Sequence, residues 1–454
     1  MKPYNLRTLA SAMNGSLLQP GDGEVVITSG ASTDTRMIKA GALFFALRGE
    51  NFDAHEFLDQ ASVAAALVVD YAEKVPVGRP AIVVDDVLSG LQQLAQWYRQ
   101  ELGIPVIAIT GSNGKTSTKD FTRSVLSQKF RVNATLGNLN NHIGLPLSVL
   151  ATDEDHEVGI FEMGMNHSGE LAPLCEIARP DISMITNVGS AHIENMGSRE
   201  AIAEEKGTVA RALTKEGTLL IPSDSDFIGQ YRETSAGRIL PVGQGATVRA
   251  ENLVTDIEGS RFDLVIEELG SISANIPVTG VHMVNNALLA AGAGFLMGLS
   301  LEEIVAGLSE TQLTGGRLCQ WDHQGVQVID DTYNANPESV AAALDTLAAL
   351  PSDGNKIVAL GKMAELGNHT EGAYRNAGQL AAEKKLRLIV VGSEAATMAT
   401  AAREAGGEVD FFRGIATAAE FLKTIIAPGD IVLFKGSRAA AMEKVMEETF
   451  PPPQ

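Results

Sequence analysis

One segment of the chain has the residue types and spacing of a loop that binds the phosphate groups of a nucleotide. It reads Gly111-Ser112-Asn113-Gly114-Lys115-Thr116, and it lies between an apolar run and a helical pattern. Glycines let backbone N–H groups turn toward phosphate oxygens, and the start of a helix adds partial positive charge. The lysine of such a loop reaches the β- and γ-phosphates, and the hydroxyl after it ligates Mg²⁺. We therefore predict that Lys115 and Thr116 contact a nucleoside triphosphate and its Mg²⁺.

The spacing of this loop departs from the common form. A glycine usually stands five positions before Gly114, where this chain has Ile109. The alternative interpretation is a strand, a turn with two glycines and a surface lysine. Strand, Gly-Lys-Thr and helix occur in the order that favours the phosphate loop. The residues predicted to bind the nucleotide are Thr110, Gly111, Ser112, Asn113, Gly114, Lys115, Thr116 and Ser117.

Two further side chains that could bind a metal ion follow apolar runs. Glu162 comes after residues 158–161, and His192 follows residues 182–188. The C-terminal ends of parallel strands meet at the edge where open α/β sheets bind ligands, and the phosphate loop leaves the same edge. Taken singly, a helix-capping glutamate and a loop histidine with its own partners are reasonable alternatives, and histidine is an unusual ligand for Mg²⁺. The shared edge favours a metal site made by Thr116, Glu162 and His192.

The elements that must position these residues are those of an α/β protein. At 454 residues the chain is long enough for about three domains. Buried apolar runs alternate with helical patterns, which predicts βαβ units and parallel sheets. We predict a small N-terminal α/β domain over 1–84, a central phosphate-loop domain over 85–313 and a C-terminal Rossmann-like domain over 314–454. The predicted strands include 25–28, 43–47, 66–69, 81–84, 105–110, 158–161, 182–186, 326–329, 356–360, 386–391 and 431–434.

Two helices are also well marked in the sequence. The amphipathic stretch from Val87 to Leu102 is expected to join the first two domains. A second helix is expected to begin at Asn336, which would cap it, with Pro337 in the first helical position.

Composition excludes several classes of protein. The formal charge of −21 and the pI near 4.8 argue against a nucleic-acid-binding protein, which needs a basic face. The two cysteines cannot form a disulfide framework or a cysteine-based metal site. The chain has no apolar signal region and no run of the ~18 residues that a membrane span requires. We expect a cytoplasmic monomer that does not insert into membranes.

Several longer motifs resemble those of the Mur ligases. The similarity covers the whole chain and is strongest to the branch that joins D-alanyl-D-alanine to a UDP-N-acetylmuramoyl-tripeptide. The phosphate loop alone is also similar to that of folylpolyglutamate synthases. The more discriminating motifs are 137–146 (GNLNNHIGLP), 162–170 (EMGMNHSGE), 330–337 (DDTYNANP) and 435–438 (KGSR).

The resemblance implies roles for particular residues. It makes Lys115, Glu162, His192 and Lys206 the catalytic set, with Mg²⁺ on Glu162 and His192. Lys206 would be carbamylated by CO₂, although in its stretch 201–206 it is by itself typical of a solvated helix lysine. Asn286 would lie near the adenine, and Arg317 and Asp331 would close on phosphate and ribose. The residues implied to bind the UDP-linked substrate are Ser32, Thr33, Asp34, Arg36, Arg48, Gly49, His55, Asn138, Asn140 and Asn141.

The implied reaction is ATP-dependent amide-bond formation in peptidoglycan synthesis. ATP would phosphorylate the terminal carboxylate of the tripeptide, and the amine of D-alanyl-D-alanine would attack the acyl phosphate. The chain departs from the family pattern at Lys362, Tyr374 and Thr208, where an acid, a histidine and a glutamate are common. The first two departures leave open how the C-terminal domain contacts its ligands.

Three other functions remain open at this point. The chain could be another Mur-type or folylpolyglutamate-type ligase, although the asparagine-rich motifs argue against that. It could be a phosphate-loop regulator, which would leave the first 84 residues without a role. A catalytically inactive scaffold is disfavoured because Lys115, Thr116, Glu162, His192 and Lys206 are all present.

Overall fold

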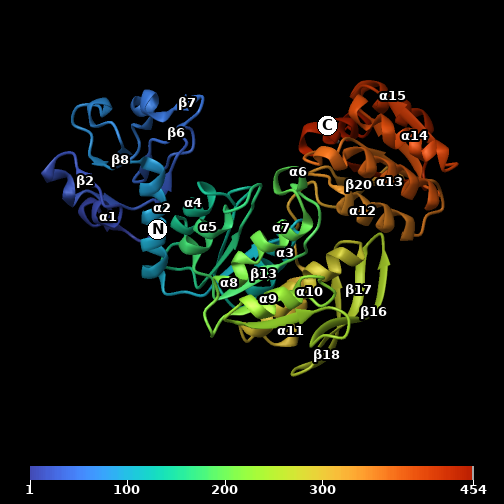
Figure 1. Ribbon diagram of the computed structural model, residues 1–454, viewed down its shortest axis with the longest axis horizontal. Helices are drawn as coiled ribbons and strands as arrows, with labels where there is room; N and C mark the ends of the chain where they lie inside the picture. Colours follow the sequence, from blue (N-terminus) through green and yellow to red (C-terminus); the bar gives the residue numbers. More distant parts are fainter. Residues whose placement is uncertain (452–454) are drawn as a thin grey trace.

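Three α/β lobes follow one another along the chain, as the predicted fold class requires (Figure 1). The computed structural model describes residues 1–451, so the last residues of the predicted third domain, 452–454, lie outside the described part. The N-terminal and C-terminal lobes lie at opposite ends of the molecule, with the central lobe between them. The predicted boundaries near 84 and 313 fall between the three main sheets, which occupy residues 16–83, 106–276 and 319–435.

The N-terminal lobe is built on a five-stranded sheet of order β2-β9-β8-β5-β4, parallel except for β2. Two short antiparallel pairs, β1–β3 and β6–β7, lie outside that sheet. The predicted run 25–28 is therefore a strand, but it pairs with β1 rather than with the main sheet. The elements are β1 (Tyr4–Asn5), α1 (Leu6–Ala12), β2 (Ser16–Leu17), η1 (Pro20–Glu24), β3 (Val26–Ile27), β4 (Ala31–Ser32), β5 (Leu43–Phe45), β6 (Arg48–Gly49), β7 (Phe52–Asp53), η2 (Ala54–Ala61), β8 (Ala66–Val69), η3 (Ala72–Lys74) and β9 (Ala81–Val83).

Helix α2 (Val87–Leu102) joins the first two lobes, with the bounds that the sequence predicts. The Asp86 side chain caps its start by accepting a hydrogen bond from the Ser89 N–H, and Gly103 ends it in the left-handed conformation. Its buried residues, Leu91 and Tyr98 among them, belong to an apolar core that contains residues of both lobes. The helix is therefore a packed connection between the lobes.

The central lobe has a nine-stranded sheet of order β11-β12-β10-β13-β14-β15-β16-β17-β18. It is parallel up to β16, and β16, β17 and β18 form an antiparallel extension. Its strands are β10 (Val106–Thr110), β11 (Val132–Ala134), β12 (Val158–Glu162), β13 (Ile182–Ile185), β14 (Thr218–Pro222), β15 (Arg238–Val242), β16 (Val248–Asp256), β17 (Gly259–Ile266) and β18 (Gly270–Ile276). Its helices are α3 (Lys115–Leu126), α4 (Gly144–Leu150), α5 (Leu171–Ala178), α6 (Ile193–Met196), α7 (Arg199–Lys206), α8 (Thr208–Arg211), α9 (Ile228–Thr234), α10 (Val281–Leu296) and α11 (Leu301–Ser309).

Strand β10 is buried on both faces, which explains its unbroken apolar sequence. Ile107 and Ile109 pack into one core with the helices α3, α10 and α11, whereas Val106 and Ala108 face the other core. In register, Ile109 of β10 lies opposite Glu162 of β12. The strand ends that carry the predicted site therefore share one edge of the sheet.

The C-terminal lobe has a six-stranded sheet of order β19-β20-β24-β21-β22-β23, parallel except for β19. Helix α12 begins as predicted, with Asn336 as its cap and Pro337 in its first position. The elements are β19 (Cys319–His323), β20 (Val326–Asp331), α12 (Pro337–Ala349), β21 (Lys356–Leu360), η4 (Gly367–His369), α13 (Thr370–Glu383), β22 (Arg387–Val391), η5 (Ser393–Ala395), α14 (Ala396–Glu404), β23 (Val409–Phe412), α15 (Ile415–Ile425), β24 (Ile431–Lys435), η6 (Arg438–Ala440) and α16 (Met442–Thr449). Across residues 1–451, none of the helices combines the length and the apolar character that crossing a membrane would require.

Candidate active site

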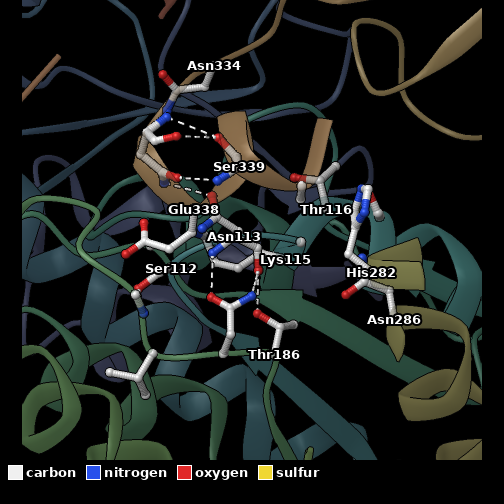
Figure 2. Close-up of a pocket in the computed structure, with 18 of the residues that line it drawn as sticks. Ser112, Asn113, Lys115, Thr116, Thr186, His282, Asn286, Asn334, Glu338 and Ser339 are labelled. Carbon is white, nitrogen blue, oxygen red and sulfur yellow. Dashed lines mark hydrogen bonds between the residues drawn. The ribbon is translucent and has the colours of Figure 1, made fainter. Parts of the chain in front are cut away.

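The phosphate loop connects β10 to α3 and is held from the side by the segment after β13. Gly111 and Gly114 have φ angles of +155° and +78°, and a Cβ on Gly111 would lie 1.8 Å from the Thr186 hydroxyl. The N–H of Asn113 donates to Asn187 Oδ1 at 3.0 Å, and the Asn187 amide donates back to the Asn113 carbonyl at 3.1 Å. The Thr186 hydroxyl also donates to the Asn113 carbonyl, and Figure 2 shows these two residues facing each other. The loop is thus rigid and requires glycine at these two positions.

Lys115 is the first residue of α3 and bends back over its own loop. Its Nζ donates to the Gly111 carbonyl at 2.8 Å. Burial lowers the pKa of this lysine, and the neighbouring carboxylate of Glu162 opposes that shift. A phosphate group in the loop would offer the ammonium stronger acceptors than a single carbonyl.

A network of polar side chains surrounds the Thr116 hydroxyl. Thr116 Oγ1 donates to Glu162 Oε2 at 2.8 Å and accepts from Arg317 Nη2 at 2.8 Å. The amide of Asn140 donates to the other oxygen of Glu162 at 2.8 Å. A buried hydroxyl and a carboxylate are hard oxygen donors of the kind that Mg²⁺ prefers. Among residues 1–451, no group of three or more His, Cys, Asp and Glu side chains is arranged to hold a metal, so phosphate oxygens and water would have to complete the coordination.

His192 lies near this network but has a partner of its own. It adopts a left-handed backbone conformation before α6, and its Nδ1 contacts the carboxylate of Glu365 from the C-terminal lobe. Burial lowers the pKa of its imidazole, and the Glu365 charge raises it. The structure brings His192 to the same cavity as Glu162. Its role as a metal ligand remains a prediction.

The burial of Lys206 contradicts one interpretation made from the sequence. At the end of α7 it is only 1% exposed, so the idea of a solvated helix lysine is wrong. Packing of α7 into the core of the central lobe places it there, which the local sequence does not reveal. Burial is the main cause that holds its pKa well below the ordinary value, and the charge of Lys115 adds to the effect. A buried amine with a lowered pKa is more often neutral, and a neutral amine is nucleophilic.

A cavity of about 660 Å³ opens between the central and C-terminal lobes. Its walls combine the phosphate loop, the ends of β12 and β13, helix α10 and the start of α12. Figure 2 shows the loop with Thr186 after β13, His282 and Asn286 of α10, and Glu338 and Ser339 of α12. Of the predicted site residues, the cavity lining contains Ser112, Asn113, Gly114, Lys115, Thr116, Ser117, Asn138, Asn140, Asn141, Glu162, His192, Asn286, Arg317 and Asp331. The predicted residues outside the lining are Thr110, Gly111, Lys206, Ser32, Thr33, Asp34, Arg36, Arg48, Gly49 and His55.

Helix α10 forms the side of the cavity where the adenine was expected. Asn286 lies against the phosphate loop, and a Cβ on Gly114 would come within 2.7 Å of its side-chain oxygen. His282, one turn earlier, also lines the cavity. The pKa of His282 is lowered to about 4, mainly by burial and also by the positive charge of Lys435, while the charge of Asp345 opposes the shift. This wall is therefore uncharged at neutral pH.

The lowered pKa of His282 predicts how stability depends on pH. The folded chain disfavours the proton that an unfolded chain accepts near pH 6.5. This contribution to stability is therefore complete above about pH 6.5 and is lost as the pH falls toward 4. When the pH is lowered from 7 to 4.5, the melting temperature of His282→Asn should fall less than that of the unaltered chain. Replacing the exposed histidine in His369→Asn is the control, and an equal fall in all three would contradict the assignment.

The C-terminal lobe supplies a charged pair at the opposite wall. Lys435 Nζ donates to Asp331 Oδ2 at 2.6 Å and to the Asn334 carbonyl at 2.9 Å. Burial raises the pKa of Asp331, and the charge of Lys435 opposes this shift. The guanidinium of Arg317 lies 3.9 Å from the ring centre of Tyr333, which orients it toward Thr116.

Some contacts between the two lobes were missed from the sequence. Asn336, predicted only as a helix cap, also donates to Asn113 Oδ1 at 2.7 Å. Glu338 accepts from the N–H and the hydroxyl of Ser190 at 2.8 and 3.0 Å. The NANP motif signals the helix start, but only the fold brings it to the phosphate loop. In this structure the C-terminal lobe is docked on the loop.

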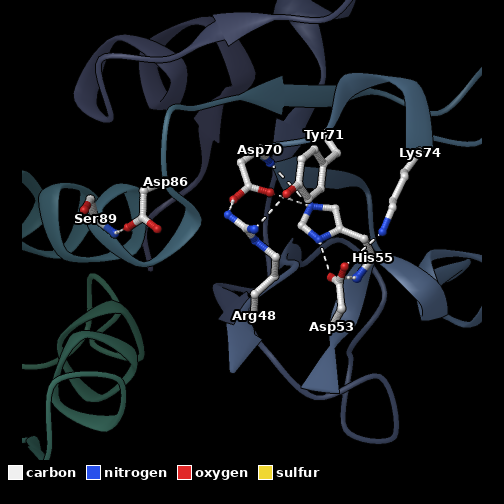
Figure 3. Close-up of polar contacts among 8 residues, drawn as sticks. All are labelled: Arg48, Asp53, His55, Asp70, Tyr71, Lys74, Asp86 and Ser89. Carbon is white, nitrogen blue, oxygen red and sulfur yellow. Dashed lines mark hydrogen bonds and ion pairs between the residues drawn. The ribbon is translucent and has the colours of Figure 1, made fainter. Parts of the chain in front are cut away.

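The candidate substrate residues of the N-terminal lobe lie apart from the cavity. His55 is buried, and its ring is held between Asp53 (2.7 Å) and Asp70 (3.1 Å), as Figure 3 shows. Arg48 donates to Asp70 and Tyr71, and its guanidinium lies 4.8 Å from the Tyr71 ring centre. His55 thus helps to fix the carboxylates, whereas Arg48 is partly exposed and available to a ligand.

A second group in the same lobe is a local turn. Ser32 accepts a hydrogen bond from the Asp34 N–H, and Asp34 forms a two-bond contact with the exposed Arg36. Thr33 directly follows β4, and Gly49 is the second residue of β6. None of these residues lines the cavity at the phosphate loop.

The three departures from the family pattern do not touch the cavity. Lys362 pairs with Glu394 at 3.3 Å, and the Tyr374 hydroxyl bonds to the backbone of Met363. Thr208 accepts a hydrogen bond from Arg211. These substitutions leave the residues around the phosphate loop unchanged.

Comparison with known proteins identifies the family. Residues 109–294 match the Mur ligase middle domain, and residues 316–438 match the Mur ligase, glutamate ligase domain. The chain is 36% identical to a UDP-N-acetylmuramoyl-tripeptide–D-alanyl-D-alanine ligase of Bacillus subtilis (strain 168), over 99% of this chain and 98% of that protein. The chain belongs to the Mur ligase family. Its resemblance to the branch that contains this relative, expected from the asparagine-rich motifs, is confirmed.

Solved structures of Mur ligases agree with this assignment. A crystal structure of MurF from Acinetobacter baumannii superposes with a TM-score of 0.90 at 32% identity and covers 99% of both chains. MurF ligase from Thermotoga maritima, solved in complex with ADP, has a TM-score of 0.82 at 26% identity and covers 93% of this chain and 97% of that one. The three-lobed architecture of this Mur ligase is therefore that of known family members.

Proposed function

We propose that this Mur ligase joins D-alanyl-D-alanine to UDP-N-acetylmuramoyl-tripeptide in a reaction driven by ATP. The observation that carries the proposal is the cavity between two lobes, where a phosphate loop faces Arg317 and Asp331. The identity of the substrates is supported by relatives such as the Bacillus subtilis ligase, which is similar over its whole length. The ADP in the Thermotoga maritima structure supports ATP as the nucleotide.

The proposed reaction begins with activation of a carboxylate. The terminal carboxylate oxygen of the tripeptide attacks the γ-phosphorus of ATP, the bond to ADP breaks, and an acyl phosphate forms. The amine of D-alanyl-D-alanine then attacks the acyl carbon, an amide bond forms, and phosphate leaves with loss of a proton from nitrogen. Lys115 and Arg317, which both reach the phosphate loop, would stabilise the negative charge that spreads over the transferring group.

Magnesium is the cofactor that the donor set fits. Thr116 and Glu162 would hold it beside the phosphates, and His192 would join them after releasing Glu365. When bound, the ion supplies charge neutralisation and orientation of the phosphate oxygens. Asn140 keeps the Glu162 carboxylate oriented through its hydrogen bond.

Lys206 is proposed to carry a carbamate formed with CO₂. The neutral amine attacks the carbon of CO₂, a C–N bond forms, and one proton leaves the nitrogen. The product is an anionic oxygen group in place of a buried cation. Burial and the lowered pKa both favour the neutral amine that this reaction needs.

The three domains are proposed to divide the work, with boundaries near residues 84 and 313. The N-terminal lobe would bind the UDP-sugar through Ser32–Arg36, Arg48, Gly49 and His55, and Asn138, Asn140 and Asn141 would face the peptide end. Closure of the C-terminal lobe would exclude water, which would otherwise hydrolyse the acyl phosphate. We further propose that the enzyme acts in the cytoplasm as a monomer.

Phosphate release tests the proposed function. The chain should release phosphate from ATP only when UDP-N-acetylmuramoyl-tripeptide and D-alanyl-D-alanine are both present. Single amino acids, including glutamate, should not replace the dipeptide. Turnover with a single amino acid would instead favour a sibling ligase, and slow hydrolysis that ignores both substrates would favour a nucleotide-dependent regulator.

A further inference from the structure

The linker between the central and C-terminal lobes, residues 310–318, is bonded to α3, the helix that begins at the phosphate loop. Asp120 lies in α3 and is only 3% exposed. Its Oδ2 accepts from the N–H of Thr314 at 2.8 Å and from the Thr314 hydroxyl at 2.9 Å. Its other oxygen lies 3.3 Å from Nζ of Lys119, which is also buried. This carboxylate is thus a fixed, charged anchor for the start of the linker.

The same face of α3 receives a second contact from the linker. Thr116 and Asp120 are four residues apart, so both lie on one side of the helix. Thr314 binds Asp120, and Arg317, three residues further along the linker, donates to Thr116. The linker therefore contacts the helix at two successive turns, and the contact between Arg317 and Thr116 lies inside the proposed ATP cavity.

The conformation of the linker between the two contacts is narrowly defined. Gly316 has a φ of +75°, its carbonyl accepts from the N–H of Tyr333, and a Cβ there would lie 3.1 Å from that nitrogen. Tyr333 in turn carries the Arg317 guanidinium on its ring. The head of Arg317 is oriented by Tyr333, whereas its distance from Thr116 depends on where Thr314 is held.

We propose that Asp120 is a positioning residue for the ligase reaction, because it holds Thr314 at the place from which Arg317 reaches the ATP site. The inference rests on the proposed function in so far as it assigns Arg317 to the phosphoryl-transfer step. A charged acceptor suits this task, since hydrogen bonds to a carboxylate are about twice as strong as neutral ones. Asp120 itself lies outside the lining of the cavity, so it would act through Arg317 and not by direct contact with a ligand there.

A double-mutant cycle tests the proposal. Asp120→Asn should lower kcat/KM for ATP by about tenfold or more, because a small misplacement of a charged group is costly, while KM for the UDP-tripeptide stays the same. In an Arg317→Ala background the same change should cost less than about twofold, because the residue that it positions is gone. Ser124→Ala is the matched control, since it removes a hydrogen bond from α3 to Gly307 that does not involve the linker.

Two results would overturn the proposal. One is an equal fold-loss from Asp120→Asn in both backgrounds, as a general loss of stability would give. The other is unchanged ATP kinetics in a folded Asp120→Asn protein. Because that change leaves Lys119 without its carboxylate, Thr314→Val is the second variant, which removes one linker hydrogen bond and keeps the ion pair.

The proposal can fail separately from the proposed function. If the unaltered chain shows no dipeptide-dependent turnover, the proposed function fails. The role of Asp120 can still be tested by calorimetric titration, which measures the affinity for a non-hydrolysable ATP analogue in the presence of Mg²⁺. The analogue should then bind about tenfold more weakly to Asp120→Asn than to the unaltered chain and to Ser124→Ala. Equal affinity in all three would overturn the role of Asp120.

Discussion

Replacing Lys115 by alanine should abolish ATP turnover, with a loss of about a thousandfold or more in kcat/KM. The ammonium already lies in the phosphate loop, 2.8 Å from the Gly111 carbonyl, where it would contact the phosphates of a bound nucleotide. Binding of the UDP-tripeptide should change little, because the residues expected to hold the UDP-sugar belong to the N-terminal lobe. Phosphate release and calorimetric binding of the UDP-tripeptide measure the two effects.

The loop itself should survive this change. Asn113 is held by Thr186 and Asn187, and those contacts do not involve Lys115. Lys129→Ala removes another lysine close to the end of α3 and serves as the control. Turnover of Lys115→Ala within a few-fold of the unaltered chain would show that the loop does not bind the reacting phosphates.

Replacing Lys206 by methionine should lower the ligase rate on the order of a hundredfold, because an anionic group beside the metal site would be lost. Methionine has nearly the shape of the lysine side chain, and it places no charge at a position that is only 1% exposed. Because burying a charge is costly, the folded state should be at least as stable as that of the unaltered chain. The exposed Lys215 offers the matched control, Lys215→Met.

A direct signal of the carbamate accompanies this prediction. ¹³C-labelled bicarbonate should give a protein-bound carbamate resonance in the unaltered chain and in Lys215→Met, but not in Lys206→Met. Full ligase activity in Lys206→Met, or a resonance that persists in it, would contradict the proposed modification.

Three strands of the central sheet, β10, β12 and β13, could be predicted because each is a mostly apolar, fully buried run. In the C-terminal lobe, β21 (Lys356–Leu360) likewise has the bounds that its apolar run gives. Strands β16 and β18 were not predicted, because many of their residues are exposed and they lack a continuous apolar run. Strands β11, β14, β15 and β17 were also missed, although β14 and β17 are largely buried. Burial on both faces thus favours the prediction of a strand from its local pattern but does not ensure it.

The site was only partly predictable for a related reason. Spacing alone identifies Lys115 and Thr116, and the shared sheet edge adds Glu162. The burial of Lys206 depends on how α7 packs, and the contact between Asn336 and Asn113 joins residues that are 223 positions apart. Neither has a local signal, so tertiary structure was needed to find both.

Transfer of oxygen from the tripeptide to phosphate tests the central claim most directly. The claim is that the cavity beside the phosphate loop makes an acyl phosphate from ATP and the peptide carboxylate. If the terminal carboxylate of the UDP-tripeptide is labelled with ¹⁸O, each phosphate released during ligation should carry one labelled oxygen, detected by mass spectrometry. Ligation that releases only unlabelled phosphate would contradict the acyl-phosphate step, because the bridging oxygen of that intermediate leaves with the phosphate.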